Sequence, residues 1–120
     1  HATMFRFEEL HVYQEALNFV DEVYQLTKTF PREEMFGLTN QIRRSAASIA
    51  LNIAEGTSRT KKDLGHFLDI ARGSCYETVA SLTISRKRNY ITETNFQNAY
   101  SQCERLSKMI SKLKTSLLLP

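Results

Sequence analysis

The sequence predicts an all-α protein, an antiparallel up-down-up-down four-helix bundle, on three observations. Apolar residues recur at the three- and four-residue spacing of a helix in four long segments. Only 4 Gly and 2 Pro occur among 120 residues, too few for the many turns of a β-sandwich. The 42% apolar content excludes a disordered chain, and the length suits one domain. We therefore expect one domain over residues 5–120, with helices at about 7–29, 32–55, 60–88 and 92–118.

The first helix ends at Phe30-Pro31, because the residue before a proline is disfavoured in the α conformation. Its main apolar seam consists of Leu10, Tyr13, Leu17, Val20 and Tyr24. Two more apolar rows lie beside this seam, Val12-Phe19-Leu26 and Ala16-Val23-Phe30. Such a wide apolar surface fits either a deeply buried helix or a helix with one stripe in a subunit interface. The candidate interface residues are Val12, Phe19, Leu26 and, on the second helix, Ala47.

The second helix begins after Pro31 and is expected to end at Gly56 in a left-handed cap. Its inward row consists of Met35, Leu38, Ile42, Ile49 and Ile53. A strip of small residues runs beside that row: Ser45, Ala46, Ala47, Ser48, Ala50 and Ala54. Small side chains let a neighbouring helix approach closely, so this strip is a second candidate contact surface.

The third and fourth helices open on Thr60 and Thr92, which are typical N-cap residues. The third helix has the seam Leu64, Leu68, Ala71, Cys75, Val79 and Leu82. The fourth has Phe96, Ala99, Cys103, Leu106, Ile110, Leu113 and Leu117. Gly65 and Gly73 each cost the third helix about 1 kcal/mol relative to Ala. We expect them where another backbone approaches closely.

Charge is divided unevenly between the two halves of the chain. Residues 1–58 carry 5 basic and 8 acidic side chains, whereas residues 59–120 carry 11 and 5. The basic clusters are Arg59, Lys61 and Lys62; Arg86, Lys87 and Arg88; and Lys108, Lys112 and Lys114. In the predicted topology the first and third clusters meet at one bundle end. They fit either a solvated surface or a phosphate-binding one, and no base-reading motif accompanies them, since the aromatic residues are placed for packing.

No set of residues predicts an enzyme, a metal site or a cofactor. Glu8-x-x-His11 and Asp63-x-x-His66 have metal-ligand spacing, but both lie on polar faces in first turns and are interpreted as solvated helix starts. Cys75 and Cys103 fall at nearly the same level of two core seams, where free thiols without a nearby base are inert.

Asn52 and Glu55 lie near the end of the second helix. Glu55 breaks a local rule, because a carboxylate in the last turn of a helix opposes the helix dipole. They are expected either to bond internally, to the following loop or to Arg43, Arg44 or Arg59, or to serve a function.

Targeting signals are not found. His1, Ala2 and Thr3 look like a cloning remnant before a native start at Met4, and no apolar run is long enough to span a membrane. We therefore expect a cytoplasmic protein with free thiols.

Over roughly residues 5–116, the chain resembles the bacterial four-helix-bundle family of the 23S ribosomal RNA intervening-sequence protein. The residues that carry this resemblance include Arg43-Arg44, Asn52-Ile53-Ala54-Glu55-Gly56 and Gly73-Ser74-Cys75-x-Glu77. The resemblance implies a protein without enzymatic activity. It also implies a relation to the accessory variability protein of diversity-generating retroelements, a basic homopentamer that binds nucleic acid and a reverse transcriptase.

Two functions remain open on these grounds. The first is a non-enzymatic homo-oligomer, a pentamer by resemblance, that binds structured RNA or DNA through its basic clusters. The alternative is a protein-binding adaptor or assembly factor that binds no nucleic acid.

Overall fold

Four α-helices make up most of residues 5–118, the part of the chain that this computed structural model describes. They are α1 (His11–Thr27), α2 (Leu38–Gly56), α3 (Lys61–Lys87) and α4 (Glu93–Ser116). Two 3₁₀ turns, η1 (Arg6–Glu9) and η2 (Arg32–Glu34), precede α1 and α2. Residues 1–4, interpreted above as a cloning remnant and native start, and residues 119–120 lie outside the described part.

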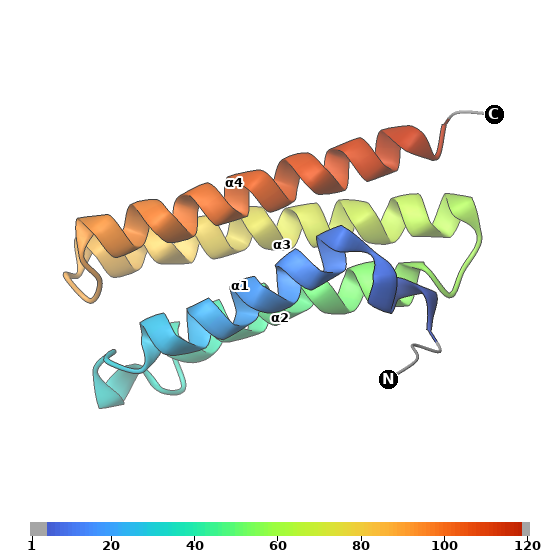
Figure 1. Ribbon diagram of the computed structural model, residues 1–120. Helices are drawn as coiled ribbons and strands as arrows, with labels where there is room; N and C mark the ends of the chain where they lie inside the picture. Colours follow the sequence, from blue (N-terminus) through green and yellow to red (C-terminus); the bar gives the residue numbers. More distant parts are fainter. Residues whose placement is uncertain (1–4, 119–120) are drawn as a thin grey trace.

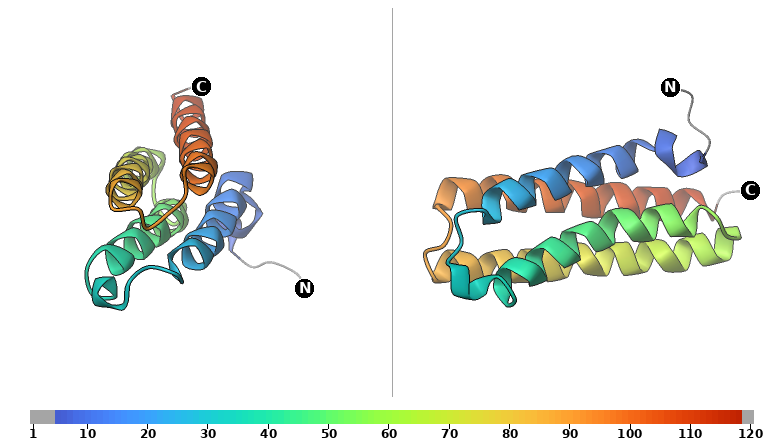
Figure 2. Two further views of the ribbon diagram at one scale, coloured as in Figure 1. Left: turned by 90° about the vertical axis from the view of Figure 1, so that its left-hand side faces the viewer. Right: turned by 90° about the horizontal axis from the view of Figure 1, so that it is seen from below.

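The helices run alternately up and down the long axis of the molecule (Figure 1). Each helix packs against its neighbours in the chain, and α1 also packs against α4. The end view shows the four rods around one core, with α1 and α2 opposite α3 and α4 (Figure 2). The predicted all-α, antiparallel four-helix bundle is therefore confirmed. None of the helices in the described residues is long and apolar enough to cross a membrane.

Both of the first two helices begin later than predicted, because a carboxylate caps a tight turn before each. The Glu8 carboxylate accepts the Phe5 amide at 3.1 Å, and extended Leu10 separates η1 from α1. In the second loop, Glu34 Oε1 accepts the Leu38 amide at 3.2 Å, so α2 begins at Leu38 instead of at 32. At the other end of α1, the helix stops at Thr27, two residues before the predicted end at 29.

Glu34 also links the two loops at one end of the bundle. Its Oε2 accepts the Tyr90 hydroxyl at 2.9 Å, and the Arg88 Nε donates to the same hydroxyl at 3.0 Å. The Leu38 amide, the Tyr90 hydroxyl and the Arg88 charge lower the pKa of Glu34 from its ordinary value of 4.5. Between Arg88 and Tyr90, Asn89 adopts a positive φ of 63° and ends α3. The loop before α2 is thus fastened to the turn between α3 and α4.

Thr60 and Thr92 cap their helices as predicted. The Thr60 hydroxyl accepts the Asp63 amide at 3.2 Å, and the Thr92 hydroxyl accepts the Asn95 amide at 3.1 Å. Local side-chain chemistry therefore sets the starts of α3 and α4 without help from the rest of the fold.

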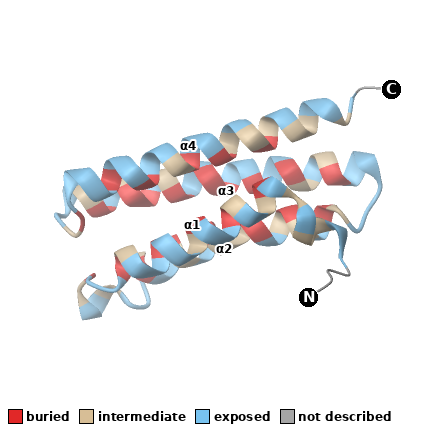
Figure 3. Ribbon diagram, in the orientation of Figure 1, coloured by how far each residue is buried: buried red, intermediate tan, exposed pale blue. Residues whose placement is uncertain are grey.

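The core uses a different face of α1 from the predicted seam. The buried residues of α1 are Val12, Ala16, Phe19, Val23 and Thr27. Leu17 and Tyr24 of the predicted seam are exposed instead. The buried face has the small residue Ala16 at its centre, whereas the exposed row contains tyrosines, whose hydroxyls stay in water. The predicted placement of Val12 and Phe19 at a subunit interface is wrong, because both lie in the core of the single chain. Figure 3 shows that all four helices carry buried residues.

On α2 the predicted row holds for its three isoleucines, which are fully buried. Met35 is exposed, because it lies in the turn before the helix. The small-residue strip mostly faces neighbouring helices of the same chain: Ser45, Ala46 and Ala50 are buried, and Ala47 is half-buried.

Side-chain hydrogen bonds, two of them between hydroxyl groups, join the first half of α2 to α3. The hydroxyls of Ser45 and Thr78 lie 2.7 Å apart, and those of Ser48 and Ser74 lie 2.9 Å apart. At the level of the α2 start, Gln41 Nε2 donates to Glu77 at 2.7 Å. We call this set of three contacts the hydroxyl ladder. Because every rung joins a particular pair of residues, the ladder fixes the register between the two helices.

Two glycines have roles other than those predicted. Gly56 is the last residue of α2 and has no positive φ, so the predicted left-handed cap is wrong. A Cβ at Gly56 would lie 2.7 Å from Leu64 Cδ1 and 2.9 Å from Phe67 Cβ, so this glycine makes room for α3. Gly73 was expected beside another backbone, but nothing in the described residues lies within 4 Å of its Cβ position.

This contrast predicts opposite effects for the same substitution. Gly56→Ala should lower the free energy of unfolding by about 1–3 kcal/mol, because the added methyl group overpacks the α2–α3 junction. Gly73→Ala, the matched control, should raise it by up to about 1 kcal/mol, because alanine is the better helix former. Urea unfolding measures both, and a Gly56→Ala protein as stable as the wild type would contradict the packing argument.

The lowered pKa of Glu34 predicts a pH-dependent contribution to stability. A carboxylate whose pKa is depressed on folding stabilises the protein above its ordinary pKa, and this stabilisation is lost as pH falls through the folded value. The stability difference between wild type and Glu34→Gln should therefore shrink as pH falls below 4.5, the ordinary pKa of the carboxyl group. Urea unfolding at several pH values tests this, with Glu33→Gln in the same turn as the control. A constant difference would show that the Glu34 charge is irrelevant.

Candidate nucleic-acid interface

The acidic and basic halves of the sequence lie on different faces of the folded bundle. The acidic half of the chain forms α1 and α2, and the half with 11 basic and 5 acidic side chains forms α3 and α4. These two helix pairs lie on opposite sides of the core (Figure 2). The excess positive charge therefore belongs to the α3–α4 side.

The first and third basic clusters meet at one end of the bundle only in part. Lys61 and Lys62 are exposed in the first turn of α3, and Lys114 Cε lies 3.9 Å from the Cβ position of Gly65 in the next turn. Lys108 lies farther along, because it borders the same hollow as Cys75 at the middle of α3, roughly 21 Å from Lys61 along that helix. The lysines thus extend from that end along the α3–α4 side.

Several predicted phosphate ligands already have partners within the chain. Lys114 Nζ pairs with Asp69 at 2.7 Å, and Arg59 pairs with Glu55 at 3.4 Å. The Arg86 guanidinium lies 3.8 Å from the centre of the Phe96 ring and pairs with Glu93 at 3.3 Å. Arg88 donates to Tyr90, as described above. Among the described residues, no such partner is seen for Lys61, Lys62, Lys87 and Lys112.

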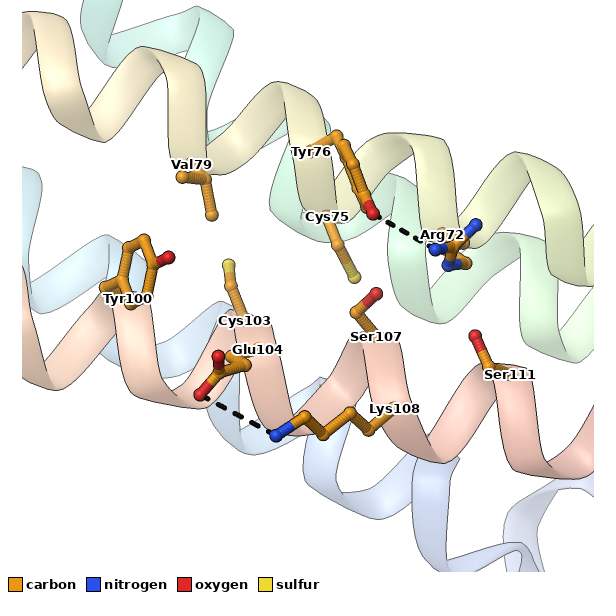
Figure 4. Close-up of a pocket in the computed structure, with 10 residues that line it drawn as sticks. All are labelled: Arg72, Cys75, Tyr76, Val79, Tyr100, Cys103, Glu104, Ser107, Lys108 and Ser111. Carbon is orange, nitrogen blue, oxygen red and sulfur yellow. Dashed lines mark hydrogen bonds and ion pairs between the residues drawn. The ribbon is translucent and has the colours of Figure 1, made fainter.

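A groove of about 540 Å³ lies between α3 and α4, and its lining includes residues that the sequence analysis missed. Tyr76 and Arg72 lie toward one end of it on α3, and Tyr100 lies toward the other end on α4 (Figure 4). Tyr76 is 60% exposed and Tyr100 is 40% exposed, so the expectation that aromatic residues serve only packing is wrong for these two. The spacing of Arg72 and Tyr76 is a signal in the sequence, because residues four apart share one helix face.

Cys75 and Cys103 form the floor of this groove as free, buried thiols. Their side chains enter the space between α3 and α4 from the two helices (Figure 4). Burial raises the pKa of Cys75 to about 12, although the Arg72 charge opposes the shift. Burial also raises the pKa of Cys103, and the neighbouring Cys75 adds to this effect. The floor is therefore uncharged at neutral pH, and neither thiol is activated as a nucleophile.

The two histidines considered as metal ligands lie apart from any larger donor group. His11 Nε2 is 3.5 Å from Glu15 on the surface of α1, and the His66 ring packs edge-on against Phe67. Within residues 5–118, no group of three or more His, Cys, Asp or Glu side chains has a metal-binding arrangement.

On the opposite side of the molecule, α1 and α2 expose apolar side chains. The outer stripe of α1 consists of Tyr13, Leu17, Val20 and Tyr24. Arg43 of α2 lies 4.6 Å from the Tyr24 ring centre, which places this stripe on the α2 side of α1. Leu51 on α2 is 65% exposed and Leu17 is 43% exposed. We call this surface the α1–α2 face.

The comparison with protein families matches residues 8–112 to the 23S rRNA-intervening sequence protein. The chain belongs to this family. A similar solved structure, from Bacteroides thetaiotaomicron, is described as a protein of unknown function from the S23 ribosomal protein family. It shares 26% identity and a TM-score of 0.79 with this chain, covering 86% of this chain and 97% of that one. The comparison with curated proteins finds no match.

In this member of the 23S rRNA-intervening sequence family, most motif residues have structural partners. Ser74 and Glu77 belong to the hydroxyl ladder, and Gly56 makes room for α3. Asn52 bonds internally, but to the carbonyl and hydroxyl of Ser48 at 2.8 and 2.9 Å instead of to the predicted loop or arginines. Glu55 pairs with Arg59, one of its predicted partners.

The two arginines of the family motif differ. Arg43 Nε donates to the Thr27 hydroxyl at 2.8 Å and so ties α2 to the end of α1. Arg44 is exposed on α2. Two candidates for a subunit contact remain, Leu26 on α1 and Ala47 on α2, and both are half-buried. Ala47 lies four residues after Arg43 and therefore shares the side of α2 that faces α1.

Proposed function

We propose that the chain is a non-enzymatic helical-bundle protein that associates with copies of itself and binds nucleic acid through its α3–α4 side. The observation that carries this proposal is the division of the surface into two opposite faces. The α1–α2 face exposes apolar residues, whereas the α3–α4 side carries the excess of basic residues.

The arrangement of positive charge favours a polyanion as the partner of the α3–α4 side. Lys61, Lys62, Lys108 and Lys112 are exposed at intervals along it, and Arg72 borders the groove. A row of exposed cations binds phosphates by releasing their condensed counterions, without reading bases. Repeating this row in every copy of an assembly would strengthen the field around it.

The apolar α1–α2 face favours self-association. Leu17, Tyr24 and Leu51 are large side chains that the single chain leaves exposed. Large exposed apolar surfaces mark association sites in soluble proteins. The pentameric stoichiometry and a reverse transcriptase as a further partner stay predictions from the resemblance to the family.

The proposed nucleic-acid binding predicts how the affinity depends on salt concentration. The Lys61→Gln/Lys62→Gln variant should bind duplex RNA or DNA more weakly, and its slope of log K against log salt should be shallower by about 1.8, for two lost phosphate contacts. Lys28→Gln/Arg32→Gln, which removes the same charge from the other helix pair, should behave like the wild type. Fluorescence anisotropy at several salt concentrations measures both.

Absence of nucleic-acid binding by the wild type at low salt, or affinity that does not fall as salt rises, would contradict this part of the proposal. That result would favour the alternative function, a protein-binding adaptor whose charge serves solubility.

The self-association part predicts that Leu17→Asp lowers the mass of the wild-type assembly, because a carboxylate in an apolar contact must lose its hydration. Ile84→Asp is the matched control, since Ile84 is 51% exposed on α3, away from the α1–α2 face. Light scattering at micromolar concentration gives the masses, and circular dichroism checks folding. A monomeric wild type, or an unchanged mass for Leu17→Asp, would rule out this interface.

A further inference from the structure

The α3–α4 groove has the size and composition of a ligand-binding site. Its volume of about 540 Å³ lies within the range of ordinary ligand pockets, roughly 300–1,000 Å³. The floor consists of Cys75 and Cys103, which are buried, and Val79, which is half-buried. Tyr76 and Tyr100 present partly exposed rings at its sides. These surfaces suit a flat, uncharged ring.

Polar groups gather toward one end of the same groove. Arg72 and the hydroxyls of Ser107 and Ser111 lie there, away from the end that Val79 and Tyr100 border, and the Lys108 side chain runs back toward Glu104 (Figure 4). Arg72 Nη2 donates to the Tyr76 hydroxyl at 3.0 Å, which holds the guanidinium beside the ring. A ligand that matches both ends joins a flat ring to an anion.

A second hollow, of about 320 Å³, continues from the groove across the outer surface of α4. Both hollows are bordered by Glu104 and Lys108, so they are adjacent. Arg105 and Lys112 line the second hollow. Lys108 and Lys112 are one helical turn apart on the same side of α4. A ligand that runs through both hollows meets the aromatic groove first and then successive cations. This arrangement suits a ligand with more than one anionic group.

One acidic side chain stands on this path. The Glu104 carboxylate lies 4.0 Å from Lys108 Nζ, and both are exposed, so the pair is weakly coupled. The lysine therefore remains available to an incoming phosphate, and the carboxylate offers an acceptor to the amino group of a base.

We propose that the α3–α4 groove holds one unpaired base of a single-stranded nucleic acid. The base stacks on Tyr76, and the neighbouring phosphates contact Arg72, Lys108 and Lys112. This inference rests on the proposed nucleic-acid binding and adds to it a preference for single strands. Stacking on aromatic rings within a cationic groove is the general way in which proteins hold unpaired nucleotides.

The test uses the full chain and two ten-nucleotide probes, a single strand with 2-aminopurine at its centre and its blunt duplex, each as RNA and as DNA. The wild type should bind the single strand more tightly and change its 2-aminopurine emission. Tyr76→Leu should weaken binding about 5- to 150-fold, the effect of one lost stacking contact. Tyr76→Phe, which keeps the ring and loses only the bond to Arg72, should bind more tightly than Tyr76→Leu.

Salt dependence separates stacking from charge. Tyr76→Leu should leave the slope of log K against log salt unchanged, whereas Lys112→Gln should make it shallower by about 0.7, for one phosphate contact on a single strand. Because Tyr76 is largely exposed, both variants should unfold in urea like the wild type.

The outcomes distinguish this inference from the proposed function. If the wild type binds neither probe, nucleic-acid binding fails and the groove proposal fails with it. If it binds but Tyr76→Leu binds equally well, or if only the duplex binds, the groove proposal alone is overturned. A changed assembly mass for Tyr76→Leu would show that a second copy of the chain fills the groove. Binding of adenosine monophosphate as tight as that of the single strand would identify a free nucleotide as the ligand. Either of these last two results overturns the groove proposal.

Discussion

The close contact between α2 and α3 is the constraint on which the rest of the structure depends. Ser45 and Ser48 on α2 are small enough for α3 to approach, and their hydroxyls bond to Thr78 and Ser74. Gly56 leaves the space that the first turns of α3 require. Apolar packing alone tolerates sliding, whereas paired hydroxyls that are removed from water must keep their partners. The register of α3 therefore follows from α2, and α4, which returns along α3, inherits it.

The sequence predicts the number, order and direction of the helices well, because long apolar periodicity and threonine caps are local signals. It predicts the first two helix starts poorly, because the Glu8 and Glu34 carboxylates cap tight turns within segments whose apolar spacing continues that of the helix. The core face of α1 was also mistaken. Three apolar rows share that helix, and periodicity cannot say which row a neighbour covers. That choice depends on how α1 packs against α2 and α4, which only the folded structure shows.

The candidate binding residues show a similar division. Basic side chains are evident in the sequence, but their availability depends on partners from other segments, as Lys114 and Asp69 illustrate. Tyr76 and Tyr100 stand beside the core seams in sequence and resemble packing residues. They become the sides of a groove only because α3 and α4 leave their outer edges uncovered. Such a groove is a property of two helices together, and neither sequence segment contains it alone.

The opposite placement of the apolar and basic surfaces has a consequence for binding strength. Copies that associate through their α1–α2 faces would each direct an α3–α4 side away from that contact. A long polymer that touches one copy would then find the next at a high effective concentration, so weak individual contacts would multiply into a strong overall one. Avidity of this kind depends on assembly, and retention of the polymer would rise steeply with the number of joined copies, although no single contact becomes stronger.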